Sequence, residues 1–398
     1  MISVENALKI ISQTQTDFGE EQINLYDACD RVLAEDWSSD RDFPPFDRVA
    51  IDGIAIDFSA YKSGKRSFAI EGIVPAGTKQ KILKSDVACF EVMTGSVLPM
   101  NCNTVIRYED IDIKNNVATL LKGIVIKENQ NVHTQGKDKK KGDILVKAGV
   151  KLSSAEIGIG ASLGKELLAV KKLPKVIVVS TGNELVEINE TPADHQIRKS
   201  NVFKIQSTLK MWGIHAEIGH LNDTKNEIAE SLKLYLSHYD AVILSGGVSK
   251  GKFDYLPSVL EDLKVDKHFH RVSQRPGKPF WFGSTASTTV FAFPGNPISS
   301  FVCTLKYFKF WLDLCLYDKA EANQYASLSE DFSFAPQLTY FLEVSLHNDR
   351  EGKLWAKPQK GNGSGDLSNL VNVDAFLQLP LDRSSFKAGE AFRILKFR

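Results

Sequence analysis

The chain has 398 residues, which is too long for one ordinary domain and predicts two to four. Apolar residues make up 43% and charged residues 25%, a balance typical of a soluble globular protein with an ample core. Lysine plus arginine and aspartate plus glutamate both number 49, so no net charge attracts the chain to nucleic acid or to a membrane surface. Any anion binding must therefore be local.

The cysteines and the N-terminus predict a cytoplasmic protein. The N-terminus MISVENALKIISQ has Glu5 where a signal peptide needs a basic start and an unbroken apolar run. The apolar segment 298–317 contains Lys306, Lys309 and Asp313, so we interpret it as an amphipathic, largely buried helix instead of a membrane span. The cysteines are scattered, without a CxxC or zinc-like pattern, which fits a reducing compartment. They are Cys29, Cys89, Cys102, Cys303 and Cys315.

The first 170 residues mix helical and β-like patterns. Residues 1–40 are expected to be helical, because apolar residues recur at helical spacing in two runs. Residues 41–134 contain short β-like runs between glycine and proline turns and predict a β-rich inserted module. SSAEIGIGASLG (153–164) has small residues at helical spacing behind a serine cap and is expected to rejoin the N-terminal helices. The two apolar runs are Val4, Ala7, Leu8 and Ile11, then Cys29, Val32 and Leu33.

Between residues 171 and 317, strand-like and helix-like patterns alternate. KVIVVS, DAVIL and TTVFAF are continuous apolar runs, typical of strands buried on both faces of a parallel sheet, and IHAEIGHL is a further strand. Helices are expected over SNVFKIQSTLKMWG, from a capping box at Thr224 to Glu227 up to about Tyr239, from residue 255, and from Ile298. The alternation predicts a doubly wound α/β domain. The tail, residues 319–398, returns to short strands and predicts a small β-domain.

Three strand ends carry loops rich in glycine, serine and proline. They are STGNEL (180–185), SGGVSKGKFDY (245–255) and PGNPIS (294–299). Ligands of an open parallel sheet bind beyond the carboxyl ends of its strands, where such loops lie. Each loop alone fits an ordinary turn equally well. Together, with the acids Glu184 and Asp254, they favour a site where backbone amides meet an anion.

Further candidates come from charged loops. RPGKPFWFG (275–283) holds Arg275 and Lys278 around a tight Pro-Gly turn, so both cations can face one anion, although a pair of solvated charges is the alternative. The loops FPPFDRVAIDG, with Asp47 and Asp52, and MTGS (93–96) fit ordinary β-turns. Carboxylates that converge from separate segments also suit magnesium, which needs carboxylate oxygens, water and substrate phosphates.

Nine motifs, in this order, resemble the molybdopterin molybdotransferases, the family of MoeA and of the gephyrin E-domain. The motifs span nearly the whole chain: PPFDRVAIDG, MTGSVLP, QGKDKKKGD, STGNEL, SNVF, SGGVSKGKFDY, RPGKP, PGNPIS and GSGDL. The resemblance implies a multi-domain α/β fold and an elongated homodimer, with the active cleft between the α/β domain and the partner's β-rich module. The expected domains are a helical N-terminal/linker domain (1–40 plus 135–170), a β-rich inserted domain (41–134), a doubly wound MogA/MoaB-like α/β domain (171–317) and a small C-terminal β-barrel-like domain (318–398).

The resemblance also implies a reaction. The family inserts molybdate into adenylylated molybdopterin and releases AMP in a Mg²⁺-dependent step, so this chain is expected to hold Mg²⁺ with Glu184, Asp254 and Asp52 and to contact a molybdopterin adenylyltransferase transiently. Thr94, Asp138 and Asp223 match positions linked to activity, although a helix cap explains Asp223 equally well. Arg275, Lys278, Ser299 and Ser364 are the candidates for molybdate. Those four and the remaining substrate-binding candidates are Thr181, Gly182, Ser245, Gly246, Gly247, Ser249, Arg275, Lys278, Pro294, Gly295, Asn296, Pro297, Ser299 and Ser364.

Several residues depart from the family pattern and leave alternatives open. Most replace an acid by a neutral or basic group, which weakens a cation site, and Glu343 stands where an arginine is expected to help hold molybdate. A second hypothesis is therefore a scaffold that binds the pterin nucleotide without turnover. A third, a nucleotide-processing enzyme that shares only the α/β domain, leaves residues 41–134 and the C-terminal domain unexplained. The other departures are Arg48, Val49, Lys137, Asn183, Lys199 and Arg275.

Overall fold

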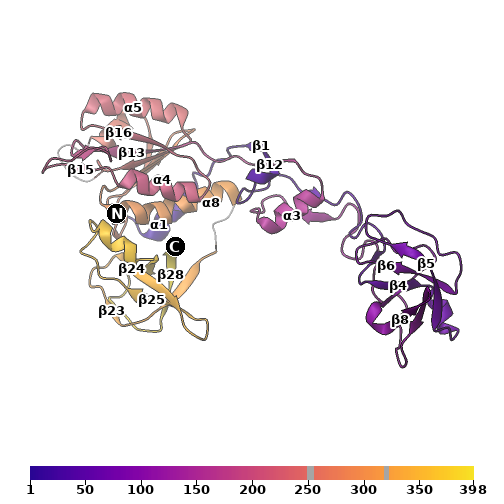
Figure 1. Cartoon of the computed structure of the whole chain (residues 1–398). Coiled ribbons are helices and arrows are strands. Elements are labelled where there is room, and N and C mark those ends of the chain that lie inside the picture. Colours follow the sequence, from indigo (N-terminus) through magenta and orange to yellow (C-terminus); the bar gives the residue numbers. More distant parts are fainter. Residues whose placement is uncertain (249–254, 318–321) are drawn as a thin grey trace. The chain divides into compact units, whose positions relative to one another are not determined.

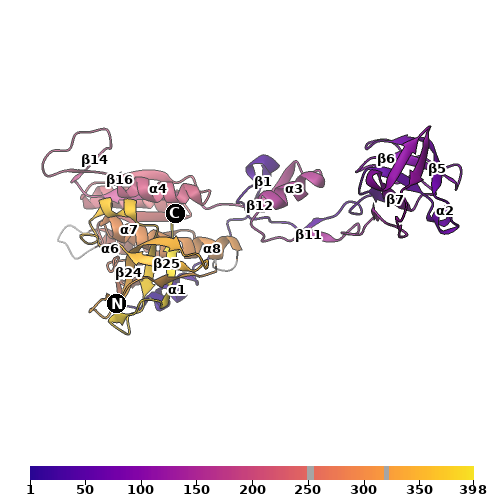
Figure 2. The same cartoon turned by 60° about the horizontal axis from the view of Figure 1, so that its bottom comes forward.

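The computed structural model describes residues 1–248, 255–317 and 322–398, coloured along the chain in Figures 1 and 2. The chain forms two compact units. The larger consists of Met1–Ala34, Gly149–Ser153 and Leu167–Arg398, and the smaller of Glu35–Ala148 and Ser154–Glu166. The finer division into four domains stays a prediction.

The larger unit contains a six-stranded sheet in the order β16-β13-β17-β21-β20-β18. The strands β16, β13, β17 and β21 are parallel, as predicted, whereas β20 and β18 extend the sheet with antiparallel pairing. The sequence analysis missed β18 because its residues, DKHFH, are mostly polar and exposed. The strands are β13 (Val176–Thr181), β16 (Glu217–Leu221), β17 (Ala241–Ser245), β18 (Asp266–His270), β20 (Trp281–Ser284) and β21 (Thr289–Phe293).

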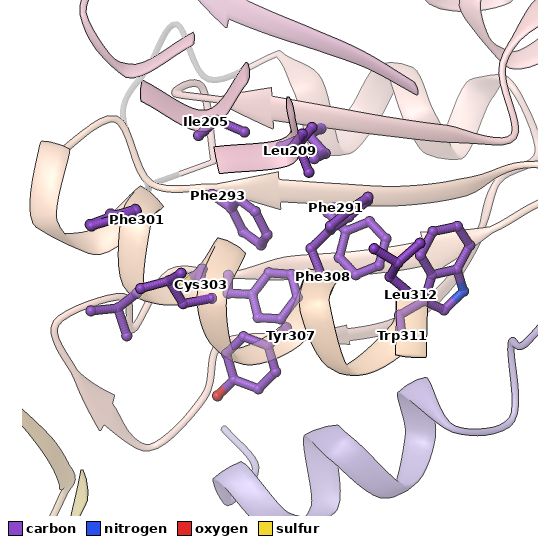
Figure 3. Close-up of a cluster of buried hydrophobic side chains, with 14 of the residues drawn as sticks. Ile205, Leu209, Phe291, Phe293, Phe301, Cys303, Tyr307, Phe308, Trp311 and Leu312 are labelled. Atoms are coloured by element: carbon purple, nitrogen blue, oxygen red, sulfur yellow. The ribbon is translucent and has the colours of Figure 1, made fainter. Parts of the chain in front are cut away.

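Alternate residues of the central strands pack into two cores on opposite faces of this sheet. Val178 belongs to one core and Val179 to the other. Figure 3 shows the first core, where the ring of Phe291 lies 5.5 Å from that of Trp311 between centroids. Burial on both faces explains the continuous apolar runs and confirms the doubly wound prediction. The helices α4 (Asn201–Met211), α7 (Pro297–Cys303) and α8 (Lys309–Tyr317) contribute to the first core, and α5 (Lys225–His238) and α6 (Leu256–Asp262) to the second.

The predicted buried helix after Pro297 is confirmed. It runs from α7 into α8 through a π-helical turn, η3 (Thr304–Phe308). Even its charged residues are paired inside the protein: the Lys306 Nζ donates to the Gln378 Oε1 at 2.7 Å, and the Lys309 Nζ lies 2.7 Å from the Asp313 Oδ1. Across the described ranges, no helix is long and apolar enough to cross a membrane.

One predicted helix is wrong. The second apolar run of residues 1–40 forms bridges instead, Val32 with Lys151 and Leu33 with Val170. Apolar residues at this spacing fit one helical turn or a short extended segment, and long-range pairing decides between them. The preceding strand β1 (Glu20–Asn24) likewise pairs with β12 (Leu167–Lys171), while the first run forms the predicted helix α1 (Val4–Ile11).

The helix α3 (Ser154–Ser162) forms as predicted, and its grouping with the N-terminal helices stays a prediction with the rest of the four-domain division. One expectation about a helix start is wrong. The helix α5 follows Thr224 as predicted, yet the Thr224 side chain makes no capping hydrogen bond. The Asn222 Nδ2 instead donates to the Glu227 carboxylate at 3.0 Å, which satisfies the acid outside a capping box.

The C-terminal strands close into the predicted small barrel. Pairings run from β24 to β25, β22, β28 and β26, and β26 pairs back with β24. These strands gather in yellow in Figure 1. The short strand β19 (Gln274–Arg275) lies along β24, so the RPGKP segment attaches to the barrel. The barrel strands are β22 (Gln324–Leu328), β24 (Thr339–Asn348), β25 (Leu354–Pro358), β26 (Ala375–Leu379) and β28 (Ala391–Lys396), with β23 (Phe332–Ser333) paired to β27 (Ser385–Phe386).

The smaller unit is β-rich, as predicted for residues 41–134. Its six-stranded sheet has the order β7-β4-β6-β5-β9-β8, with one hydrophobic core on each face, and Figure 2 shows β5, β6 and β7 in it. The sheet strands are β4 (Gly53–Ile56), β5 (Ser67–Val74), β6 (Ala88–Val92), β7 (Thr104–Arg107), β8 (Ile111–Lys114) and β9 (Val117–Leu120). The unit also contains α2 (Phe58–Lys62) and the pairs β3 (Arg48–Val49) with β10 (Val132–His133) and β2 (Trp37–Ser38) with β11 (Ile144–Val146).

Candidate functional site

A cavity of about 700 Å³ lies in the larger unit, where loops follow β13, β17 and β21. The loops meet there because the carboxyl ends of parallel strands share one edge of a sheet. Ser249 and Asp254, two further predicted site residues, lie outside the described residues. The predicted residues that line the cavity are Thr181, Gly182, Glu184, Asp223, Ser245, Gly246, Gly247, Arg275, Lys278, Pro294, Gly295, Asn296, Pro297, Ser299 and Ser364.

The loop after β13 is joined to the end of β16 by a reciprocal pair of hydrogen bonds. The Asn183 N–H donates to the Asp223 Oδ2 at 3.3 Å, and the Asp223 N–H donates to the Asn183 Oδ1 at 3.0 Å. Asp223 therefore fixes the STGNEL loop and does not cap α5. Thr181 lines the cavity, and its buried Oγ1 has no hydrogen-bond partner among the described residues.

The loop after β17 requires glycine at its turn. Gly246 has a φ of +111°, and a Cβ atom there would lie 2.5 Å from the Thr181 Oγ1. Its N–H donates to the Phe293 carbonyl at 3.0 Å, which ties this loop to the end of β21. Gly246 and Gly247, which carry no side chain, contribute backbone atoms to the wall of the cavity.

The loop after β21 is held from two directions. The Asn201 Nδ2 donates to the Ser245 Oγ at 3.1 Å and to the Gly295 carbonyl at 2.6 Å. On the other side, the Asn296 Nδ2 donates to the Ser364 Oγ at 2.9 Å. Ser364 lies beyond β25 of the barrel, so the cavity wall combines α/β and C-terminal residues.

The RPGKP turn presents two cations on a buried polar support. Gln274 is fully buried; its Nε2 donates to the Pro276 carbonyl at 3.0 Å, and its Oε1 accepts a hydrogen bond from the Tyr307 hydroxyl. The Arg275–Pro276 peptide bond is cis. Arg275 and Lys278 line the cavity and are exposed, and neither forms an ion pair with a described residue. Both positive charges are therefore available for an anion.

Three predicted catalytic residues belong to the smaller unit. The Asp52 Oδ1 accepts hydrogen bonds from the Thr94 N–H at 2.6 Å and from its hydroxyl at 2.7 Å. These bonds, the backbone one foremost, lower the pKa of Asp52 and keep its carboxylate ionised. The Asp138 Oδ1 lies 2.9 Å from the His133 Nε2, a partner that the sequence analysis did not single out.

Family comparisons cover the chain in three consecutive stretches. Residues 2–164 match the MoeA N-terminal region (domain I and II), residues 177–313 a probable molybdopterin binding domain, and residues 325–397 the MoeA C-terminal region (domain IV). A molybdopterin molybdenumtransferase of Synechocystis sp. is 40% identical, over 98% of this chain and 99% of that relative. The chain belongs to the molybdopterin molybdenumtransferase family.

Further members of this family agree over their full length. The molybdopterin molybdenumtransferase of Staphylococcus epidermidis is 29% identical, over 99% of this chain and 95% of its own. The crystal structure of the molybdopterin biosynthesis MoeA protein from Pyrococcus horikoshii OT3 aligns with a TM-score of 0.85 and 26% identity, covering 100% of both chains. These likenesses confirm the predicted family and the multi-domain α/β fold.

The departures from the family pattern have local partners. Glu343 lies in β24 and is not among the residues that line the cavity; its Oε2 accepts from the Asn369 Nδ2, and burial raises its pKa. Lys199 does line the cavity, and its Nζ lies 2.5 Å from the Glu187 Oε1. The Glu343 carboxylate is therefore not part of the cavity wall.

Among the described residues, the carboxylates that line the cavity are Glu184 and Asp223. Within residues 1–248, 255–317 and 322–398, no group of three or more His, Cys, Asp or Glu residues is placed to hold a metal ion. Magnesium commonly takes one or two carboxylates and completes its shell with water and substrate phosphates. Two carboxylates in a cavity of about 700 Å³, which has room for a substrate and water, fit that requirement.

The sequence analysis missed two residues that support the cavity. Asn201 stands in the quoted SNVF motif, but nothing in the motif shows that its amide reaches two other loops. Gln274 lies just before the RPGKP turn, and a lone polar residue there carries no signal of burial. Both act through contacts between residues far apart in sequence.

Proposed function

We propose that the chain inserts molybdate into adenylylated molybdopterin and releases AMP, a reaction in keeping with the name of its relatives, molybdopterin molybdenumtransferase. The observation that carries this proposal is the cavity in the larger unit. It combines two glycine-rich turns, the PGNP loop, and Arg275 and Lys278, which form no ion pair with a described residue. Backbone amides and cations of this kind suit phosphates and a molybdate dianion. The full-length agreement with named transferases favours this enzyme over a scaffold without turnover.

The proposed roles follow from charge and position. Arg275 and Lys278 bind the oxyanions, and the SGG and PGNP loops receive the pterin phosphates. Mg²⁺, held by Glu184 and Asp254 with Asp52 as a further candidate, would offset negative charge at the diphosphate bond that is cleaved. Because the cations and Glu184 line one cavity, they can act on one substrate.

The finer features of the family resemblance are part of the proposal. We expect a cytoplasmic homodimer in which Asp52, Thr94 and Asp138 act on the same substrate, and a transient contact with the adenylyltransferase that supplies it. A homodimer would let residues of the smaller unit of one protomer serve the cavity of its partner. Mixing an Asp52→Asn chain with an Arg275→Gln chain tests this idea, because only a mixed dimer would then regain activity.

The direct test is AMP release by the purified chain with adenylylated molybdopterin, molybdate and Mg²⁺. We expect release that needs both molybdate and the metal, and a loss of about tenfold or more in Glu184→Gln and in Asp254→Asn. Asp194→Asn is the matched control, because this exposed carboxylate lies nearby in sequence but does not line the cavity. Tight binding of the pterin nucleotide without AMP release under any metal would support the scaffold hypothesis instead.

A further inference from the structure

The first turn of α4 braces the loop that follows β21. Asn201, at the start of this helix, donates from its Nδ2 to the Gly295 carbonyl at 2.6 Å. One turn later, the Lys204 Nζ donates to the Pro297 carbonyl at 2.5 Å and lies 3.4 Å from the Asn201 Oδ1. Two carbonyls of the PGNP segment are therefore turned toward one helix.

Lys204 makes these contacts without an acidic partner. Besides Pro297 and Asn201, its Nζ faces the ring of Phe301, 5.4 Å from the centroid. No described carboxylate pairs with it, and burial is the sole cause that lowers its pKa, to about 7. Lys204 is half-buried, and a lysine held there without a counter-ion costs some stability that an apolar residue of the same length would avoid. Packing alone does not explain it, whereas the hydrogen bond to Pro297 does.

We call the hydrogen bonds from Asn201 to Gly295 and from Lys204 to Pro297 the brace. The brace determines which way the Asn296 amide points. In a trans peptide the C=O and the N–H lie on opposite sides, so a Gly295 carbonyl aimed at Asn201 directs the Asn296 N–H away from α4. This N–H has no hydrogen-bond partner among the described residues, and Asn296 lines the cavity. The next amide, that of Ile298, is by contrast occupied by the Ser364 carbonyl at 3.1 Å.

We propose that Asn201 and Lys204 are positioning residues that hold the Gly295–Pro297 segment so that the Asn296 N–H faces a phosphate of the substrate. This inference rests on the proposed function for the identity of that phosphate, but the brace itself does not depend on turnover. Asn201 lines the cavity, whereas Lys204 does not and need not touch the substrate. The role of Lys204 is to fix the backbone.

The proposal predicts that the KM for adenylylated molybdopterin rises as the pH rises. Below about pH 7 the Lys204 ammonium donates to Pro297, and above it the neutral amine donates more weakly. Neither α4 nor α7 brings a charged group into contact with Lys204 that would shift this balance. We therefore expect the KM for adenylylated molybdopterin to rise between pH 6 and pH 8, and this rise to vanish in Lys204→Arg, which stays charged.

The test combines kinetics with amide exchange. In Lys204→Met we expect KM to rise by about tenfold or more with kcat changed less, and the Ile298 amide to exchange with solvent about tenfold faster, because a hydrogen bond to a charged group is lost. Lys204→Arg should restore both. The control is Gln206→Leu, on the same helix, which removes a hydrogen bond to the Ala216 carbonyl (2.7 Å) away from the loop and should change neither.

The two readouts separate failure of the brace from failure of the proposed function. Faster exchange confined to the loop, in a protein that releases no AMP, would support the brace and refute the reaction. Exchange of the Ile298 amide at the wild-type rate in Lys204→Met would overturn the brace. Equal acceleration of exchange throughout α4, α7 and the loop would also overturn it, because Lys204 would then only stabilise the fold.

Discussion

The Asn296 Nδ2 donates to the Ser364 Oγ at 2.9 Å, a bond that joins the loop after β21 to the segment beyond β25 of the C-terminal barrel. Ser364 also accepts, through its carbonyl, from the Ile298 N–H at 3.1 Å. The wall of the cavity is therefore shared by two parts of the larger unit that are about seventy residues apart in sequence, and the position of one depends on the other.

Ser364→Ala should weaken substrate binding. The change removes the acceptor of Asn296 and a hydroxyl from the cavity but leaves the carbonyl that accepts from Ile298. We expect the KM for molybdate to rise by about fivefold, as for one partly exposed hydrogen bond of about 1 kcal/mol. Steady-state AMP release at varied molybdate measures it. Ser368→Ala, whose hydroxyl bonds Asp366 at 2.6 Å and does not line the cavity, should leave KM unchanged.

Gly246→Ala should destabilise the fold. The new Cβ would lie 2.5 Å from the Thr181 Oγ1 at a φ of +111°, so both contact and backbone oppose it. We expect a loss of about 1–3 kcal/mol in the free energy of unfolding, measured by urea denaturation. Gly295→Ala is the matched control, because its φ is not positive and its nearest neighbour would lie 3.5 Å away. Equal losses in both variants would contradict this explanation.

The strand-end loops could be predicted from the sequence, whereas their supports could not. Continuous apolar strands followed by Gly, Ser and Pro identify the edge where STGNEL, SGGVS and PGNP meet, because the rule depends only on strand direction. The contacts of Asn201 and Gln274 arise from tertiary packing, which no local pattern encodes. The same holds for Val32 and Leu33, where pairing with distant residues overrode a helical spacing.

Charged residues in the sequence predict the kind of ligand, but not whether each charge has a partner in the fold. Arg275 and Lys278 were expected to face an anion, and the structure leaves both without an ion pair among the described residues. Lys199, which the sequence analysis treated only as a departure, lines the same cavity but is neutralised by Glu187. The assignment of Asp254 to the metal stays a prediction, since that residue lies outside the described residues.

Removal of the positive charge of Arg275 or of Lys278 should lower the affinity of the cavity for an anion. In Arg275→Gln or Lys278→Gln, we expect the KM for molybdate to rise by about tenfold to a hundredfold, the usual loss for a charge-assisted hydrogen bond. The KM of each variant should also depend less on salt concentration than the wild-type KM, because fewer charges are left for salt to screen. The control is Lys267→Gln on β18, which changes the net charge by the same amount but does not line the cavity. It should behave like wild type.

Tyr307→Phe should cost stability through the support of the RPGKP turn. Tyr307 and Gln274 are both fully buried, so loss of the hydroxyl leaves the Gln274 Oε1 without its donor. We expect about 1–3 kcal/mol less free energy of unfolding. A double-mutant cycle with Gln274→Leu checks the cause: if the oxygen left unpaired is responsible, the double variant should lose less than the sum of the single ones.

Thr94→Val should shift the acid limb of the pH profile. In the wild type, the Thr94 N–H first and its hydroxyl second lower the pKa of Asp52 below its ordinary value of 3.8. A lowered carboxyl pKa means that Asp52 stays ionised, and its hydrogen bonds to Thr94 persist, until the pH falls through the folded-state pKa. Valine retains the backbone N–H but removes the hydroxyl. The pKa of Asp52 should therefore rise but stay in the range of a carboxylic acid. Carboxyl ¹³C NMR titration measures this pKa. The fall in the rate of AMP release on the acid side of the pH profile should move to a correspondingly higher pH. Thr94→Ser keeps both donors and should titrate like wild type; an unchanged Asp52 pKa in Thr94→Val would show that the backbone bond alone sets it.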